Sequence, residues 1–218
     1  MNRRLGVLIS GRGSNLQSII DAIAAGQLDA SIALVVSNRA EAAGLERARL
    51  AGIETLVLDH RGFPTREDYD RAVVAALRAR EVSLVCLAGF MRLLSPAFVE
   101  AYPDAILNIH PALLPAFPGL HAQRQALEHG VKIAGATVHL VNAELDAGPI
   151  VLQAAVPVED GDTEQSLAAR ILREEHRLYP EAIRLVLEEG WRVDGRRFIP
   201  ATPARTSPGL PRRPRPGA

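Results

Sequence analysis

The sequence has very little cysteine, since Cys86 is the only one among 218 residues. A single cysteine excludes an internal disulfide and any zinc site built on two or four thiolates. The chain also lacks a long apolar run near its start, where Met1–Arg4 leads only into Leu5–Ile9. That stretch is too short for the apolar part of a signal peptide or for a membrane span. These absences predict a reduced, soluble, cytoplasmic protein.

Neither sign of charge is in excess, because 25 Lys and Arg residues balance 25 Asp and Glu residues. A general nucleic-acid or membrane binder would carry a basic excess, so neither partner is expected. The length is enough to bury one full core, which predicts a single domain over residues 1–199. Residues 200–218 are rich in proline and arginine and are predicted to be a disordered tail.

Short apolar runs alternate with longer amphipathic runs in the first half of the chain. The runs expected to be strands cover residues 6–10, 32–36, 53–58 and 83–87, and those expected to be helices follow residue 15 and cover 41–50 and 66–80. Such alternation predicts an α/β fold with a doubly wound, mainly parallel sheet. The second half is expected to add strands at 104–110, 134–141 and 149–156, a helix over 163–189 that Pro180 kinks or splits, and a hairpin over 192–198.

A glycine-rich loop, Gly11-Arg12-Gly13-Ser14-Asn15, follows the first predicted strand. Its backbone N–H groups would lie at the N-terminus of the next helix, an arrangement that suits a phosphate. Leu16 replaces the third glycine of the dinucleotide-binding motif, and no Lys-Ser/Thr pair follows as in a P-loop. The loop therefore predicts a monophosphate site, and a capped turn without a ligand is an equal alternative.

Asn108 and His110 alternate along a predicted strand, so both side chains lie on one side of it, near its C-terminal end. Open α/β sheets bind ligands at that end. An amide donor can stabilise an oxyanion, and an imidazole can donate or relay a proton, which together suit acyl transfer. Asp146, in the loop over 142–148, would raise the imidazole pKa if the two were close. Backbone hydrogen bonding at a strand end, or a turn at Asp146, would explain the same residues without catalysis.

Other motifs carry little information. Five further histidines show no metal-ligand spacing, so no metal is predicted; they are His60, His121, His129, His139 and His176. Cys86 lies in an apolar strand and is expected in the core. No G-x-S-x-G motif is present, which disfavours a serine hydrolase.

Four motifs occur together and in order: Gly11–Leu16, Ala88–Leu94, Asn108–Pro115 and Leu145–Pro149. With these motifs the chain resembles the phosphoribosylglycinamide formyltransferases, folate-dependent enzymes of purine biosynthesis, from about residue 5 to residue 190. The resemblance implies a Rossmann-like formyltransferase fold. It implies a cytoplasmic one-carbon transferase that moves a formyl group from the cosubstrate 10-formyltetrahydrofolate to the amine of glycinamide ribonucleotide, without a metal. A homodimer is left open.

The resemblance also implies a role for each site residue. The catalytic set is Asn108, His110 and Asp146, with His110 protonated beside the carboxylate. The residues that hold the ribonucleotide are Gly13, Ser14 and Asn15 at the phosphate and Glu175 at the ribose. The residues that contact the folate are Arg66, Met91, Arg92, Leu93, Leu94, Asn108 and Leu145, with the 142–146 loop closing over the pterin. A cis peptide bond is implied between Leu114 and Pro115.

Three alternatives compete with this interpretation. Formyltetrahydrofolate hydrolase uses a similar domain but has an N-terminal regulatory domain, for which a first strand at Leu5 is expected to leave no room. Methionyl-tRNA formyltransferase has a further C-terminal domain and RNA contacts, which the short tail and zero net charge do not support. A non-catalytic nucleotide- or folate-binding protein would not need the Asn108, His110 and Asp146 set.

Overall fold

The computed structural model describes residues 2–201, so almost all of the predicted tail over 200–218 lies outside the described residues. The first half contains β1 (Arg4–Ile9), α1 (Ser14–Ala24), β2 (Ser31–Ser37), α2 (Gly44–Leu50), β3 (Thr55–Val57), η1 (His60–Gly62), α3 (Arg66–Arg78), β4 (Leu84–Leu87), α4 (Pro96–Ala101) and β5 (Ile106–His110). The second half contains α5 (Ala122–Glu128), β6 (Ile133–Leu140), β7 (Ile150–Pro157), α6 (Glu164–Leu187), β8 (Arg192–Asp194) and β9 (Arg197–Ile199).

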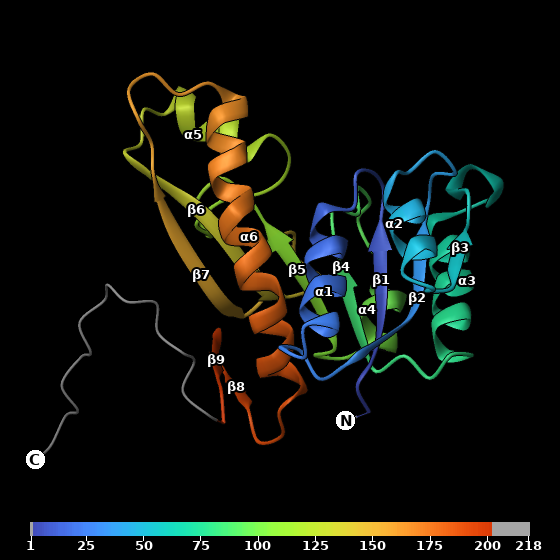
Figure 1. Ribbon diagram of the computed structural model, residues 1–218. Coiled ribbons are helices and arrows are strands. Elements are labelled where there is room, and N and C mark those ends of the chain that lie inside the picture. Colours follow the sequence, from blue (N-terminus) through green and yellow to red (C-terminus); the bar gives the residue numbers. More distant parts are fainter. Residues whose placement is uncertain (1, 202–218) are drawn as a thin grey trace, which may run out of the picture.

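The described strands form one sheet in the order β3-β2-β1-β4-β5-β6-β7-β9-β8 (Figure 1). From β3 to β5 every neighbouring pair is parallel. β6 then runs antiparallel to both β5 and β7. The prediction of an α/β fold with a doubly wound, mainly parallel sheet is confirmed, and the antiparallel pairs are confined to the C-terminal half.

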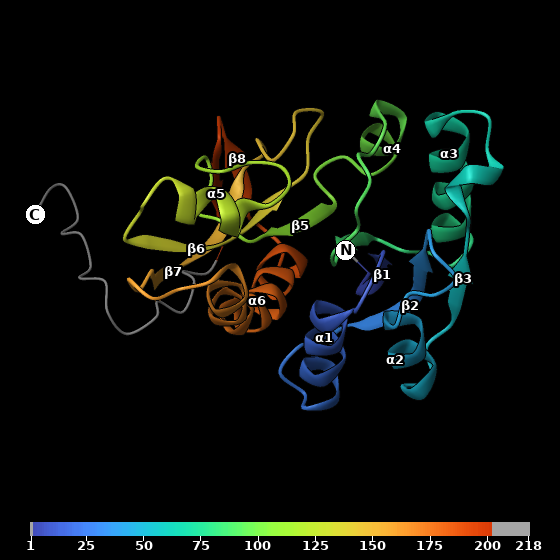
Figure 2. The same cartoon turned by 90° about the horizontal axis from the view of Figure 1, so that it is seen from above.

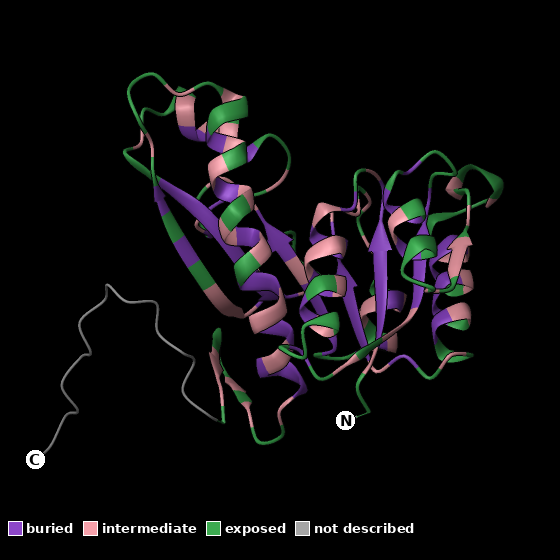
Figure 3. Cartoon of the chain, viewed as in Figure 1, coloured by how far each residue is buried: buried purple, intermediate pink, exposed green. Residues whose placement is uncertain are grey.

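Helices cover both faces of the parallel half, with α1, α2 and α6 on one face and α3 and α4 on the other (Figure 2). The strands between them are buried along most of their length (Figure 3). Their continuous apolar runs therefore reflect burial on both sides. Two apolar clusters result, one under α1 and α6 that includes Leu16 and Ile183, and one under α3 and α4 that includes Val73 and Phe98.

The long helix α6 is continuous through Pro180, so the expectation that proline splits it is wrong. Packing explains the difference, because Tyr179 is fully buried and its hydroxyl lies 2.9 Å from the carbonyl oxygen of Leu87 and 3.1 Å from that of Leu107. These contacts fix the helix to β4 and β5 at the point where proline removes a helical hydrogen bond. Thr163 caps the helix start in a capping box with Ser166.

Three short helical segments were not expected from the sequence: η1, α4 and α5. Each is at most seven residues long, too short for a clear periodic pattern. The predicted helix over 41–50 begins later, at Gly44, whose N–H donates to the carbonyl oxygen of Gly11 at 3.0 Å. Over the described residues, no helix has the length and apolar character needed to cross a membrane.

Candidate active site

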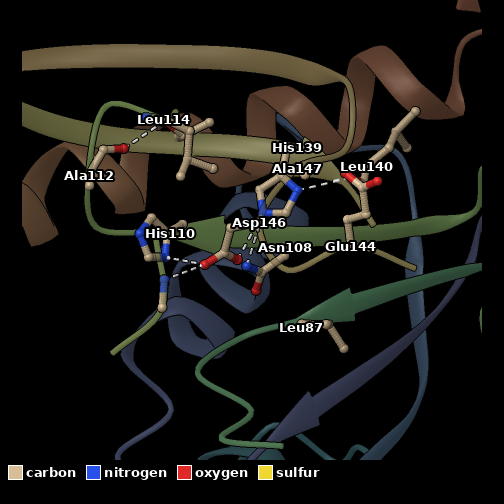
Figure 4. A network of polar contacts seen from close by, with 12 residues as sticks. Leu87, Asn108, His110, Ala112, Leu114, His139, Leu140, Glu144, Asp146 and Ala147 are labelled. Carbon is tan, nitrogen blue, oxygen red and sulfur yellow. Dashed lines mark hydrogen bonds and ion pairs between the residues drawn. The ribbon is translucent and has the colours of Figure 1, made fainter. Parts of the chain in front are cut away.

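The two residues predicted to act together lie on β5, and Asp146 reaches them from the loop between β6 and β7 (Figure 4). Oδ2 of Asp146 is 3.5 Å from Nδ1 of His110. The side chains of His110 and Asp146 are only 6% and 9% exposed, so solvent screens their interaction little. The structure thus brings Asp146 to the strand of Asn108 and His110, which the sequence could place only on a separate segment.

Asp146 has an uncommon backbone conformation, with a φ of 50° in the left-handed region. Two contacts hold the loop in this form. The N–H of Gly119 donates to Oδ2 of Asp146 at 2.8 Å, and Nη2 of Arg196 donates to the carbonyl oxygen of Ala147 at 2.9 Å. Strained conformations persist where neighbouring contacts support them, and such positions cluster at functional sites.

A fourth side chain completes the cluster, and sequence reasoning missed it. His139 on β6 lies directly opposite Asn108 on β5. Its Nδ1 donates to the carbonyl oxygen of Leu140 at 2.9 Å, and its Nε2 accepts from the Asn108 amide at 3.2 Å. Nε2 also lies 3.6 Å from Oδ1 of Asp146. A histidine without metal-ligand spacing offered no signal, because only the antiparallel register reveals its partner.

Burial determines the charge of His110. Its Nε2 donates to the carbonyl oxygen of Phe117 at 2.8 Å. Burial lowers the pKa of His110, and this effect outweighs the Phe117 carbonyl and Asp146, which both raise it. This direction favours the neutral ring at neutral pH, and the protonated imidazole expected with the resemblance stays a prediction.

Asp146 has the opposite balance. Burial alone would raise the pKa of its carboxyl group. The ring of His139, the N–H of Gly119 and the nearby His110 together outweigh burial and lower that pKa. Asp146 is therefore a carboxylate at neutral pH, and it faces Nδ1 of His110.

The predicted phosphate loop leads directly into α1. Gly13 precedes the helix with a φ of 68°, and a Cβ there would stand 2.6 Å from Cα of Gly44. No side chain fits in that space, which explains the glycine. Ser14 is the first helical residue, and N–H groups in a first helical turn have no acceptor within the helix. The loop therefore has the form that phosphate sites use, and the phosphate role stays a prediction.

Asn15 and Glu175 are both buried and contact each other across the chain. Nδ2 of Asn15 donates to Oε2 of Glu175 at 2.7 Å, which joins α1 to α6. Burial raises the pKa of Glu175, although the Asn15 amide and the charge of Arg12 oppose this effect. The amide of Asn15 therefore faces Glu175, and only its backbone N–H remains suited to the predicted phosphate contact.

The residues predicted to contact folate include exposed apolar side chains. Met91 is 62% exposed, Leu93 is 57% exposed and Leu145 is 54% exposed. Leu94, by contrast, is partly buried and packs against the cluster under α3 and α4. Exposed apolar groups of this size often mark a binding surface, and here they follow β4 and β6, on either side of β5.

The two predicted arginines share one electrostatic neighbour, Asp70. The guanidinium of Arg92 is 5.2 Å from the ring centroid of Tyr69, and Nη2 of Arg66 lies 3.8 Å from Oε1 of Glu67. Both positive charges act on the buried Asp70, where they oppose the burial that raises its pKa. An anionic tail of a ligand could be received between these cations.

Two hollows lie on the described part of the molecule. One of about 190 Å³ borders Asp146 and is also lined by Leu114, Pro115, Gly148, Ile150 and Arg196. The peptide bond between Leu114 and Pro115 is cis, as the resemblance implied. A larger hollow of about 490 Å³ lies between α3 and α4, among residues that contribute nothing to the cluster around His110.

Comparison with known proteins agrees with this geometry. Residues 3–183 match the formyl transferase family, and the chain belongs to that family. Among its relatives, the phosphoribosylglycinamide formyltransferase of Escherichia coli (strain K12) is 51% identical over 190 residues, which are 87% of each chain. The resemblance inferred from the sequence is confirmed.

Two further comparisons extend this finding. The trifunctional purine biosynthetic protein adenosine-3 of Homo sapiens is 48% identical over 84% of this chain, which corresponds to 18% of that protein. The crystal structure of glycinamide ribonucleotide transformylase 1 from Symbiobacterium toebii has 57% identity and a TM-score of 0.90, covering 91% of this chain and 94% of that one.

Proposed function

We propose that this enzyme transfers the formyl group of 10-formyltetrahydrofolate to the amine of glycinamide ribonucleotide, a step of purine biosynthesis. The observation that carries the proposal is the buried cluster in which Asp146 lies 3.5 Å from His110 on one strand with Asn108. The named relatives support the choice of substrates. We retain one domain over residues 1–199 and a cytoplasmic location, with no nucleic-acid partner and no required metal.

In this proposal the substrate amine is itself the nucleophile, so the protein needs none. The amine attacks the formyl carbon, and negative charge develops on the former carbonyl oxygen. Asn108 has a second amide hydrogen besides the one given to His139, and that hydrogen can stabilise the oxyanion. The Nε2–H of His110 can do the same once the substrate oxygen replaces the carbonyl of Phe117.

One proton must move from the attacking amine to the folate nitrogen that leaves. Asp146 is ionised and close to His110, so it can stabilise a positive charge that develops on the imidazole as the oxyanion forms. We assign the transfer itself to a water near Asp146. Because burial lowers the pKa of His110, we assign this positive charge to the reaction and not to the resting enzyme.

Binding is assigned to the flanking loops. The backbone of Gly13, Ser14 and Asn15 holds the phosphate, and Glu175 accepts a hydrogen bond from a ribose hydroxyl. The folate lies against Met91, Leu93, Leu94 and Leu145, with its glutamate near Arg66 and Arg92.

A turnover assay of the purified protein tests the proposal. Consumption of 10-formyltetrahydrofolate only in the presence of glycinamide ribonucleotide is the expected result. Consumption without the ribonucleotide would instead indicate a hydrolase. Binding of both compounds without any turnover would indicate a non-catalytic module.

A further inference from the structure

The residue that follows β1 connects two loops that have separate roles above. Ser10 is 5% exposed and directly precedes the glycine loop over 11–15. Its N–H donates to the carbonyl oxygen of Gly89 at 3.1 Å, and its hydroxyl oxygen accepts from the N–H of Met91 at 2.9 Å. Both partners belong to the segment after β4. Ser10 therefore joins the loop assigned to the phosphate to the segment assigned to the folate.

A second buried side chain sets the direction of this hydroxyl. Ser10 Oγ donates to Oδ1 of Asn38 at 2.6 Å, and Asn38, the residue after β2, is 4% exposed. The other end of the amide, Nδ2, lies 3.4 Å from Nδ1 of His60. A hydroxyl has a single hydrogen to donate. Because this hydrogen is directed to Asn38, a lone pair of the oxygen is left for Met91.

The sheet order explains why these residues meet. β2, β1 and β4 are adjacent and parallel, so the residues that follow them emerge at the same edge. Asn38, Ser10 and Met91 come from these three strand ends. The side chain of Met91 is 62% exposed, whereas its N–H is held by a buried group. The segment thus offers apolar surface to a ligand from a backbone that is fixed in place.

We propose that Ser10 and Asn38 are positioning residues that set the distance between the two substrate sites, and this inference rests on the proposed function. Ser10 holds the segment after β4 in place for the folate, and Asn38 keeps the Ser10 hydroxyl in the orientation that Met91 requires. Neither side chain needs to touch a substrate.

The first test is Ser10→Ala, which leaves the Met91 N–H and Asn38 Oδ1 without their shared partner. From the usual effect of an unsatisfied buried group, we expect KM for 10-formyltetrahydrofolate to rise about tenfold. We expect KM for the ribonucleotide to change less than about twofold, because the 11–15 loop is also held by Gly44. A loss of kcat with both KM values unchanged would contradict the proposal.

The second test is Asn38→Ala, in which Ser10 can still reach Met91 but its hydroxyl is free to turn. The same KM should rise, by about threefold, and the double variant should resemble Ser10→Ala alone because the two act as a pair. Full additivity of the two effects would overturn the pairing. If Ser10→Ala does not fold, Asn38→Ala decides the proposal by itself.

Ser83→Ala is the matched control. Ser83 precedes β4, at the opposite end of the sheet, and its hydroxyl donates to the carbonyl oxygen of Asn2. Like Ser10→Ala, this substitution removes one serine hydroxyl that is hydrogen-bonded to the backbone, but it does so far from the proposed sites. We expect both KM values to remain those of the unaltered protein.

Two readouts do not depend on turnover. Hydrogen exchange of the Met91 amide, followed by NMR, should be slow in the unaltered protein and fast in Ser10→Ala. Equilibrium binding of tetrahydrofolate should weaken about tenfold in the same variant. Rapid Met91 exchange in the unaltered protein, or unchanged tetrahydrofolate binding in both variants, would refute the positioning role. Absence of turnover by the unaltered protein would refute the proposed function alone.

Discussion

The parallel and antiparallel halves of the sheet contribute different kinds of chemical group. The parallel half ends in loops whose backbone faces the proposed substrates, as at Gly13, where a side chain would collide with Gly44. The antiparallel pair β5 and β6 instead contributes side chains from within the strands, and Asn108 lies opposite His139. Binding is thus assigned mainly to strand ends, and catalysis to a register between two strands.

This difference has a practical consequence for variants. A strand-end loop that loses one contact should still bind its substrate, although with lower affinity, because several backbone N–H groups contact the same ligand. In the buried cluster on β5 and β6 the polar groups contact one another, so the loss of one side chain leaves its neighbours without a partner. We therefore expect variants of the antiparallel half to affect kcat and variants of the parallel half to affect KM.

The largest effect is expected for His110→Ala and Asn108→Ala. Each removes one donor to the developing oxyanion, and such losses lower kcat by a factor of about 10²–10³. The KM values should change by less than about threefold if these groups act mainly in the transition state. Steady-state kinetics with both substrates varied measures the split. An unchanged kcat in both variants would contradict the assignment of catalysis to the antiparallel half of the sheet.

Asp146→Asn should have the next largest effect, and it depends on pH. The pKa of Asp146 is lowered in the folded protein, so its charge contributes stability above its ordinary pKa of about 3.9 and loses that contribution as pH falls through the lower folded value. The variant should lose this acid-dependent part of the unfolding free energy. At neutral pH we expect kcat to fall by about tenfold or more, since the developing positive charge on His110 loses its partner. Urea unfolding from pH 2 to pH 7 and a pH–rate profile measure both effects.

Glu175→Gln tests the parallel half. The substitution keeps the shape of the side chain, but it replaces one of the two acceptor oxygens by an NH₂ group, which can only donate. A glutamine therefore cannot accept from both the Asn15 amide and a ribose hydroxyl through separate oxygens. KM for the ribonucleotide should rise about tenfold, while KM for the folate stays within about twofold. A rise in the folate KM instead would mean that Glu175 serves the other substrate. Glu174→Gln, on the half-buried neighbour that pairs with Arg177, is the control and should leave both values unchanged.

The smallest effect is expected at the start of α6. Thr163→Ala removes the side-chain cap that accepts from the N–H of Ser166, which should lower the free energy of unfolding by about 1 kcal/mol. Urea unfolding measures this change. Because the cap lies away from the residues assigned to binding and catalysis, kcat and KM should not change. A changed kcat would show that the start of α6 is coupled to the active site.

The parallel half could be predicted well from the sequence. β1, β2 and β4 are apolar runs that end at glycine or polar residues, and the alternation with helices determines their neighbours. The glycine loop over 11–15 follows from local rules that need no tertiary information, and the same rules place the cap of α6 at Asp162 or Thr163 without deciding between them. Even the pair Asn108 and His110 could be placed on one side of a strand from period-two alternation.

The rest depends on contacts that local patterns do not encode. The carboxylate of Asp146 reaches His110 because the backbone at residue 146 is left-handed and Gly119 holds the carboxylate. The place of His139 beside Asn108 depends on strand register, and the lowered pKa of His110 depends on burial. For Pro180 the sequence left a kink or a split open, and the split is excluded because the buried Tyr179 keeps the helix in place.

The hairpin of β8 and β9 lies beyond the 3–183 match to the family, and the turn between its strands contacts the Asp146 loop. Arg196, which holds the carbonyl oxygen of Ala147, lies thirteen positions beyond the end of the 3–183 match. A chain shortened to that match would keep Asn108, His110 and Asp146 but lose the guanidinium group beside the Asp146 loop. In such a chain the carboxylate would spend less time in reach of the imidazole, and activity would decline although no catalytic side chain had been removed.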